Sequence, residues 1–257
     1  MNAERRKKRR NYGIFFLALA AALMGSFQYI SSYSSVSGNI NGKEMPICSV
    51  EMKEKKVALT FDAAWGNEDT ARILKILKEH EVQATFFMTG DWVEKYPEDV
   101  LAIKAAGHDL ANHSETHRSM MGLKKEEQRQ EIQTVHEKVL DLTEVEMRLF
   151  RVPYGSYDDN VIRNIEACGY YPIQWSVDSL DWKDYGAENI IETVLGSKEL
   201  KNGAIILLHN GTKYTAEALD GLLCELEKRE YQMVPVSKLI YKKGYYLDVT
   251  GRQQKKR

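Results

Sequence analysis

Apolar and polar positions along the chain alternate in a way that predicts strands and helices in turn. The apolar runs at 57–61 and 84–88 have the length and composition of buried strands. Residues 70–80 instead carry their apolar side chains at helical spacing. The order of strand then helix repeats six or seven times as far as residue 234. Such a repeat predicts a parallel sheet with crossover helices.

The other expected elements continue this pattern. We expect further strands at 108–114, 149–151, 171–175, 204–208 and 232–234, and helices at 98–106, 124–142, 159–168, 187–195 and 215–229. Polar residues follow several of the apolar runs directly. A (β/α) barrel accounts for polar residues at the strand ends better than an open sheet does.

The N-terminus predicts a membrane segment. Six basic residues at 5–10 precede an uncharged apolar stretch at 13–24, which weakly polar residues extend to position 30. Eighteen helical residues span about 27 Å, close to the thickness of a bilayer core. We expect a basic cytoplasmic tail at 1–11 and a transmembrane anchor at 12–30, with the rest of the chain outside the cytoplasm. A cleaved signal peptide, with secretion of the domain, is the alternative, because alanines occupy 20–22.

Composition suggests where the domain begins and ends. Residues 31–54 begin rich in Ser, Gly and Asn and read as a linker, and 55–242 form one domain. We expect 243–257, with its basic end, to be a C-terminal tail.

Charge and cysteine content exclude some classes of partner and site. The 257 residues include 36 Lys and Arg against 37 Asp and Glu, which argues against a nucleic-acid partner. Cys48, Cys168 and Cys224 have no close spacing, so they resemble neither a zinc cluster nor a disulfide framework. One disulfide bond and three free thiols both remain open. We expect a monomer.

Residues suited to catalysis recur just after the apolar runs, where a parallel barrel places its active-site loops. They are Asp62, His113, His117, Arg151, Asp178, Asp181 and His209. Accidental placement would scatter such residues over both ends of the strands. Their recurrence predicts one catalytic site.

Four of these residues suggest specific chemistry. On one helical turn, His113 and His117 would share a face and reach one divalent metal; two exposed helix histidines are the alternative. An acid such as Asp181 would orient His209 and hold its proton, as a general acid requires. His209 as a structural core residue is the other possibility. Arg151 beside a buried aspartate would keep that carboxylate ionised.

Five ordered motifs resemble the polysaccharide deacetylase family, carbohydrate esterase family four, whose catalytic unit is the NodB-homology domain. The motifs are TFDAAWG at 60–66, HSETH at 113–117, RVPYG at 151–155, DSLDW at 178–182 and LLHN at 207–210. The resemblance covers about 55–239. It implies a distorted (β/α) barrel that removes N-acetyl groups from chitin-like or peptidoglycan glycans with the help of a metal.

The resemblance also implies a role for each matching residue. Asp62 would be the general base, with Arg151 as its partner, and His209 the general acid, with Asp181 as its partner. His113 and His117 would bind a divalent metal, with zinc the first choice. The remaining implied residues contact the substrate: the backbone amide of Tyr154 at the oxyanion, and Trp182 and Leu207 around the acetyl methyl group.

The first motif departs from the family pattern Thr-Phe-Asp-Asp-Gly, whose second aspartate is a metal ligand. Ala63 stands at that position, and two histidines alone would hold zinc weakly. Asp62 serving also as a ligand is one explanation, and another oxygen ligand, such as Asn67, Glu68 or water, is a second. A glycan-binding pseudoenzyme is the third. The form TFDAAWG resembles the sporulation deacetylases of the PdaA and PdaB type, which also lack the second aspartate.

The sequence therefore predicts a hydrolase of non-peptide carbon–nitrogen bonds. We expect a membrane-anchored N-deacetylase whose substrate is the peptidoglycan of the cell or spore wall, or a chitin-like glycan. The alternative is a catalytically impaired wall protein that binds glycans.

Overall fold

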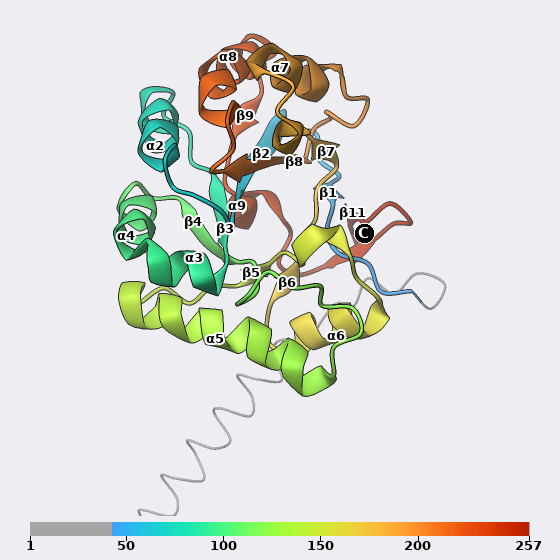
Figure 1. The fold of residues 1–257 in the computed structure, drawn as a ribbon. Coiled ribbons are helices and arrows are strands. Elements are labelled where there is room, and N and C mark those ends of the chain that lie inside the picture. The colour runs from blue at the N-terminus through green and yellow to red at the C-terminus, as the bar shows by residue number, and fades with distance from the viewer. Residues whose placement is uncertain (1–42, 257) are drawn as a thin grey trace, which may run out of the picture. The chain divides into compact units, whose positions relative to one another are not determined.

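The computed structural model describes residues 43–256 (Figure 1). The predicted basic tail, the predicted anchor and the part of the predicted linker before Lys43 lie outside the described residues. Within 43–256, no helix has both the length and the apolar character that crossing a membrane requires.

An 11-stranded sheet forms the centre of the fold. Its order is β10-β11-β1-β8-β2-β3-β4-β5-β6, with β7 paired to β8 and β9 to β2. The long strands are β2 (Lys56–Ala63) and β8 (Ala204–Asn210), which run parallel. The shorter strands are β1 (Ser49–Val50), β3 (Thr85–Met88), β4 (Asp109–Asn112), β5 (Leu149–Phe150), β6 (Tyr171–Pro172), β7 (Val177–Asp178), β9 (Gln232–Met233), β10 (Tyr245–Leu247) and β11 (Arg252–Lys255).

Helices lie around the outside of the sheet (Figure 1). They are α2 (Thr70–Glu79), α3 (Gly90–Lys95), α4 (Pro97–Ala105), α5 (Lys125–Thr143), α6 (Asp159–Ala167), α7 (Ala187–Gly196), α8 (Thr215–Lys228) and α9 (Val236–Leu239), with the 3-10 turns η1 (Pro153–Gly155) and η2 (Asp181–Lys183). The fold is thus a curled α/β half-barrel, and the predicted alternation of parallel strands and helices is confirmed.

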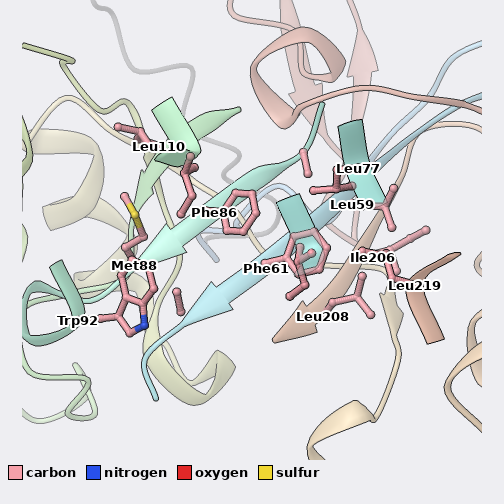
Figure 2. Packing of buried hydrophobic residues seen from close by; sticks show 14 of the residues in the cluster. Leu59, Phe61, Leu77, Phe86, Met88, Trp92, Leu110, Ile206, Leu208 and Leu219 are labelled. Atoms are coloured by element: carbon pink, nitrogen blue, oxygen red, sulfur yellow. The ribbon is translucent and has the colours of Figure 1, made fainter. Parts of the chain in front are cut away.

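The two faces of β2 have different surroundings. Leu59, Phe61 and Ala63 point outward into an apolar cluster under the helices, where Phe61 stacks on Phe86 with ring centroids 5.0 Å apart (Figure 2). Thr60 and Asp62 belong to the opposite face, because side chains alternate along a strand. The outward face therefore anchors the strand, and the inward face is free to carry polar groups.

Both ends of the described chain join the sheet. The N–H of Ile47 donates to the carbonyl of Pro172 at 2.8 Å, and Ile47 forms an isolated bridge with Ile173 beside β6. The residues assigned to a C-terminal tail include β10 and β11, and β11 pairs with β1. The predicted linker and tail therefore each included residues that belong to the domain. The polar strand Arg252–Lys255 has no apolar alternation that could have revealed it.

Candidate active site

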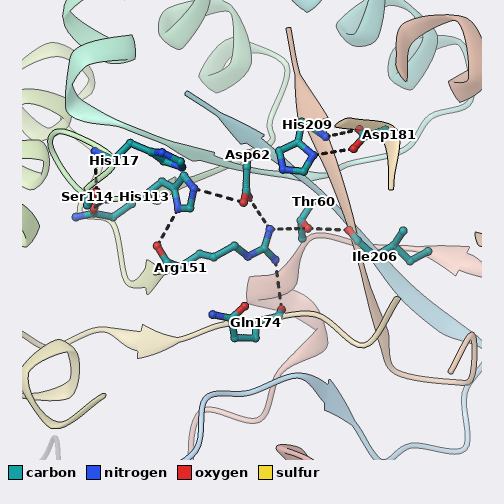
Figure 3. A network of polar contacts seen from close by, with 11 residues as sticks. Thr60, Asp62, His113, Ser114, His117, Arg151, Gln174, Asp181, Ile206 and His209 are labelled. Carbon is teal, nitrogen blue, oxygen red and sulfur yellow. Dashed lines mark hydrogen bonds and ion pairs between the residues drawn. The ribbon is translucent and has the colours of Figure 1, made fainter. Parts of the chain in front are cut away.

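The catalysis-capable residues converge on one pocket at the carboxyl ends of the strands. The pocket has a volume of about 450 Å³. Asp62, His113, His117, Tyr154, Trp182, Leu207 and His209 line it. Arg151 and Asp181 are fully buried behind it and contact the lining residues (Figure 3). The structure therefore brings together every predicted site residue.

The guanidinium of Arg151 forms an ion pair with the carboxylate of Asp62. Its Nη1 donates to Oδ1 of Asp62 at 2.6 Å and to Oγ1 of Thr60 at 2.9 Å. Its Nη2 donates to the carbonyl of Gln174 at 3.3 Å, and the ring of Phe87 lies 4.1 Å from the guanidinium carbon. A fully buried guanidinium with these partners fixes one carboxylate oxygen and leaves Oδ2 facing the histidines (Figure 3).

The charge state of Asp62 follows from this environment. Burial alone would raise the pKa of the carboxyl, but the charge of Arg151, followed by those of His113 and His209, brings it below its usual value. Asp62 is therefore ionised at neutral pH, as a general base requires.

His209 and Asp181 form a second charge pair beside the first. Nδ1 of His209 lies 2.7 Å from Oδ1 of Asp181, and the backbone N–H of His209 donates to Oδ2 at 2.7 Å. Thr215 donates to the same Oδ2 at 2.6 Å. Burial would lower the pKa of His209, but the hydrogen bond and charge of Asp181 outweigh it and raise the pKa. The shift favours the protonated imidazole, the state that a general acid needs.

The side chains of His113 and His117 lie close together, but in a loop and not on the helical turn that their spacing suggested. Residues 113–117 form a loop in which Ser114 and His117 have positive φ angles of 69° and 55°. The loop still places the two rings 4.9 Å apart at their centroids. The N–H of His117 donates to Oγ of Ser114 at 3.2 Å, which stabilises this turn.

His113 is prepared to act as a ligand through its Nε2. Its Nδ1 lies 2.8 Å from the carbonyl of Arg151, and because a carbonyl only accepts, Nδ1 carries the proton. Metal-ligating histidines commonly make such a bond with the other ring nitrogen. Burial lowers the pKa of His113 to about 4 and also lowers that of His117, so both rings are neutral at pH 7.

The donor set fits a divalent metal in part. Nε2 of His113 lies 3.5 Å from Oδ2 of Asp62, so a carboxylate oxygen faces this histidine. Ala63 is packed in the outer apolar cluster. Asn67 donates to Asp99 at 2.6 Å, and neither Asn67 nor Glu68 lines this pocket. Among the explanations for the missing aspartate, only Asp62 has its carboxylate beside one of the histidines, although Asp62, His113 and His117 are not gathered as compactly as a bound ion requires.

A different group of metal-capable residues lies outside the pocket. Among residues 43–256, His80, Asp220 and Cys224 form the one compact set of three such side chains. They lie on the outer helices, at the end of α2 and on α8, and the ring nitrogens of His80 already contact Asp220 at 3.0 Å and Glu227 at 2.9 Å. Because carboxylates occupy both ring nitrogens, this set is a surface ion-pair cluster.

Aromatic side chains form the walls of the pocket. Tyr154, in a left-handed conformation with φ 60°, has its ring 4.7 Å from that of His117. Trp65 stacks on His209 with ring centroids 5.1 Å apart. Trp65 was not among the predicted site residues, and neither was Trp175, which also lines the pocket. The only signal for Trp65 was its place in the TFDAAWG motif.

Comparisons with known proteins agree with this geometry. A model of the polysaccharide deacetylase family matches residues 49–173. The peptidoglycan-N-acetylmuramic acid deacetylase PdaA of Bacillus subtilis is 32% identical over 199 residues, which cover 74% of this chain and 73% of PdaA. The solved structure of PdaA, described as a family 4 carbohydrate esterase, has a TM-score of 0.71 and covers 76% of this chain and 84% of its own.

A second similar structure is that of BA3943 from Bacillus anthracis, described as a pseudoenzyme of the same family. It is 34% identical, with a TM-score of 0.73, and covers 80% of this chain and 72% of its own. A mutant of BA3943 described as having restored enzymatic activity is 36% identical, with the same TM-score, over 77% of this chain and 71% of its own. The motifs, the fold and these relatives together show that the chain belongs to the polysaccharide deacetylase family, the carbohydrate esterases of family four.

Proposed function

We propose that this protein is a peptidoglycan N-deacetylase that acts outside the cytoplasmic membrane. The observation that carries the proposal is the pairing of Asp62 with Arg151 and of His209 with Asp181 at one pocket, which lowers the pKa of Asp62 and raises that of His209. Hydrolysis of an amide needs a base for the attacking water and an acid for the leaving nitrogen. The relatives named for peptidoglycan deacetylation support the choice of substrate.

The proposed reaction uses both charge pairs. Asp62 takes a proton from a water, whose oxygen attacks the acetyl carbonyl carbon; His209 then gives its proton to the glycan nitrogen as the carbon–nitrogen bond breaks. The products are acetate and the free amine of the sugar. Arg151 and Asp181 act as positioning residues, because they fix the two reacting side chains through hydrogen bonds.

The substrate-contacting roles are part of the proposal. Leu207 and Trp182 line the pocket where the acetyl methyl group would lie, and the backbone amide of Tyr154 would bind the oxyanion. His113, His117 and Oδ2 of Asp62 would hold a divalent metal, which, when bound, polarises the acetyl oxygen and the water. Zinc suits two imidazoles and a carboxylate.

The test measures acetate released by the full chain, purified in detergent, from acetylated peptidoglycan and from chitin oligosaccharides. Zn, Co, Mn and Mg are supplied in separate reactions. Asp62→Asn and His209→Ala serve as inactive references, and Asp141→Asn, on the exposed side of α5, serves as the matched control. Equal background release from wild type and both references with every metal would refute the proposal.

The proposed location rests on the N-terminal sequence. Six basic residues before an apolar stretch favour a single-pass anchor at 12–30 with the catalytic domain outside the cytoplasm, at the cell or spore wall. Protease added to intact cells should then digest the domain, and protection of the domain from protease would contradict this location.

A wall protein that binds glycan without turnover is the second candidate function. Ala63 and the likeness to BA3943, itself described as a pseudoenzyme, favour it. This candidate predicts that wild type and Asp62→Asn bind wall glycan equally, with no acetate released by either. Measurable turnover by the wild type excludes it.

A further inference from the structure

The loop that carries His113 and His117 depends on its surroundings for its shape. His113 directly follows β4, and its ring is held by the carbonyl of Arg151 at 2.8 Å (Figure 3). The ring of His117 forms no hydrogen bond with any other of the residues 43–256. Its place is therefore set by the backbone of the loop, in which Ser114 and His117 have positive φ angles. Residues other than glycine rarely adopt that conformation, and it persists only where neighbouring groups maintain it.

A single carboxylate contacts both neighbours of His117 in the chain. Oε2 of Glu131, on α5, accepts from the backbone N–H of Thr116 at 2.9 Å, and Oε1 accepts from the hydroxyl of Thr116 at 2.9 Å. Oε1 also accepts from Nε of Arg118 at 2.7 Å. Because Thr116 and Arg118 flank His117, these three hydrogen bonds tie the chain to α5 on each side of the histidine.

The carboxylate of Glu131 is buried, and carboxylates are seldom buried unless they are paired. Its side chain is 4% exposed and lies on the buried side of α5, where Ile132 and Val135 pack in the apolar core. The packing of the helix therefore fixes where the carboxylate lies. If the loop left its position, both oxygens would lose their donors while still buried, which is costly. Glu131 thus favours the observed loop over other conformations.

The first part of the loop has a separate attachment, to α3. The backbone N–H of Gly90, at the start of that helix, donates to the carbonyl of Ser114 at 3.0 Å. This contact does not reach the residues next to His117. Within the described part of the chain, the hydrogen bonds that residues 116–118 form with groups beyond residues 113–118 all go to Glu131. The second half of the loop therefore depends on this one side chain.

We propose that Glu131 is a positioning residue for the proposed metal site, because it keeps the ring of His117 beside that of His113, with ring centroids 4.9 Å apart. This inference rests on the proposed function of the catalytic pocket. Glu131 acts through the backbone and the neighbours of His117, without touching the ion. Groups that orient a metal ligand in this indirect way matter for binding, and their loss typically lowers metal affinity by about 10- to 100-fold.

The test measures the zinc affinity of the full chain, purified in detergent, by competition with a chromogenic chelator. Glu131→Gln keeps the size of the side chain but turns one acceptor into an NH₂ group that faces the donors of Thr116 or Arg118. We expect its zinc affinity to fall by about 10- to 100-fold. Glu131→Asp retains a carboxylate on a shorter side chain and should recover part of the loss. The variant His113→Ala/His117→Ala measures zinc that binds elsewhere on the chain, which is subtracted.

Gln128→Met is the matched control on the same helix. Gln128 is 3% exposed, and its Nε2 donates to the carbonyls of Met120 and Leu123, at 3.0 and 3.2 Å, beyond the histidine loop. Its replacement should destabilise the protein in urea by an amount similar to that of Glu131→Gln. The zinc affinity of Gln128→Met should nevertheless equal that of wild type, because the attachment of the histidine loop is intact.

Equal zinc affinity of wild type and Glu131→Gln, including no binding by either, would overturn the inference. An equal loss of affinity in Gln128→Met would overturn it as well, since it would show only that a less stable fold binds zinc less well. Acetate release separates this inference from the proposed function. Zinc affinity that depends on Glu131, in a wild type that releases no acetate, would reject the catalysis and support the positioning role. Acetate release with zinc affinity independent of Glu131 would do the reverse.

Discussion

Two buried carboxylates, Asp62 and Asp181, serve the same pocket in this protein and have opposite tasks. Asp62 on β2 and His209 on β8 are paired in register on neighbouring strands, and Asp181 follows β7, which also pairs with β8. Asp62 is held by an arginine and keeps its own negative charge available. Asp181 instead pairs with a histidine, and its hydrogen bond and charge raise the pKa of His209.

The difference between the two pairs lies in what the partner can do with a proton. A guanidinium does not deprotonate near neutral pH, so Arg151 can only hold Asp62 ionised. An imidazole exchanges its proton in this range, so the same kind of carboxylate turns His209 into an acid. The identity of the partner therefore decides which pair contains the base and which contains the acid.

The largest expected effect comes from removing the base. Asp62→Asn keeps the size of the side chain but cannot take a proton, so kcat should fall by about 100- to 10,000-fold. Acetate release at saturating substrate measures this, with Asp141→Asn as the control. A loss of less than tenfold in a folded protein would mean that another group activates the water.

Removing Arg151 from its ion pair with Asp62 should lower the stability of the fold. Arg151→Met leaves Asp62 as a buried charge without its partner, which should destabilise the fold by about 3–5 kcal/mol. Urea unfolding followed by circular dichroism measures the change. Because the pKa of Asp62 rises once Arg151 is gone, the loss should shrink at acidic pH. A loss that is the same at pH 4 and pH 7 would contradict the role of the ion pair.

Removing Asp181 from its pair with His209 should change how kcat depends on pH. Asp181 raises the pKa of His209, so the protonated fraction of the acid, and with it the activity, should fall as pH rises through that pKa. In Asp181→Asn, the charge that offset the effect of burial on the pKa of His209 is gone, so this pKa should drop. The decline of kcat on the basic side should then begin at a lower pH. Acetate release between pH 5 and pH 10 tests this. An unchanged limb with reduced activity would show that Asp181 has a structural role only.

The smallest effect is expected at the aromatic wall that covers the acid. Trp65→Ala removes the ring stacked on His209 and one wall of the catalytic pocket, and we expect KM to rise by about tenfold with a smaller fall in kcat. Tyr246→Ala, on β10 and 50% exposed, is the matched control and should leave both constants unchanged. Equal effects of the two substitutions would exclude a specific role for Trp65.

Much of the site was predictable because it lies at the ends of strands with strong periodicity. β2 and β8 have continuous apolar runs, so Asp62 and His209 could be placed at their carboxyl ends. His113 and His117 do lie close together, but a loop with two positive φ angles brings them together instead of the helical turn that their spacing suggested. Their spacing carries no information about that loop, because backbone conformation there depends on tertiary contacts such as the bond from His113 to the carbonyl of Arg151.

By itself the sequence determined the alternation of strands and helices, the family and the identity of the charged residues in the pocket. Those follow from local periodicity and from short motifs. Only the tertiary structure decided which acid meets which base, that Trp65 covers His209, and that β11 closes on β1. These contacts join residues far apart in the chain, and a polar strand such as Arg252–Lys255 becomes a strand because β1 and β10 offer it backbone hydrogen bonds on both sides.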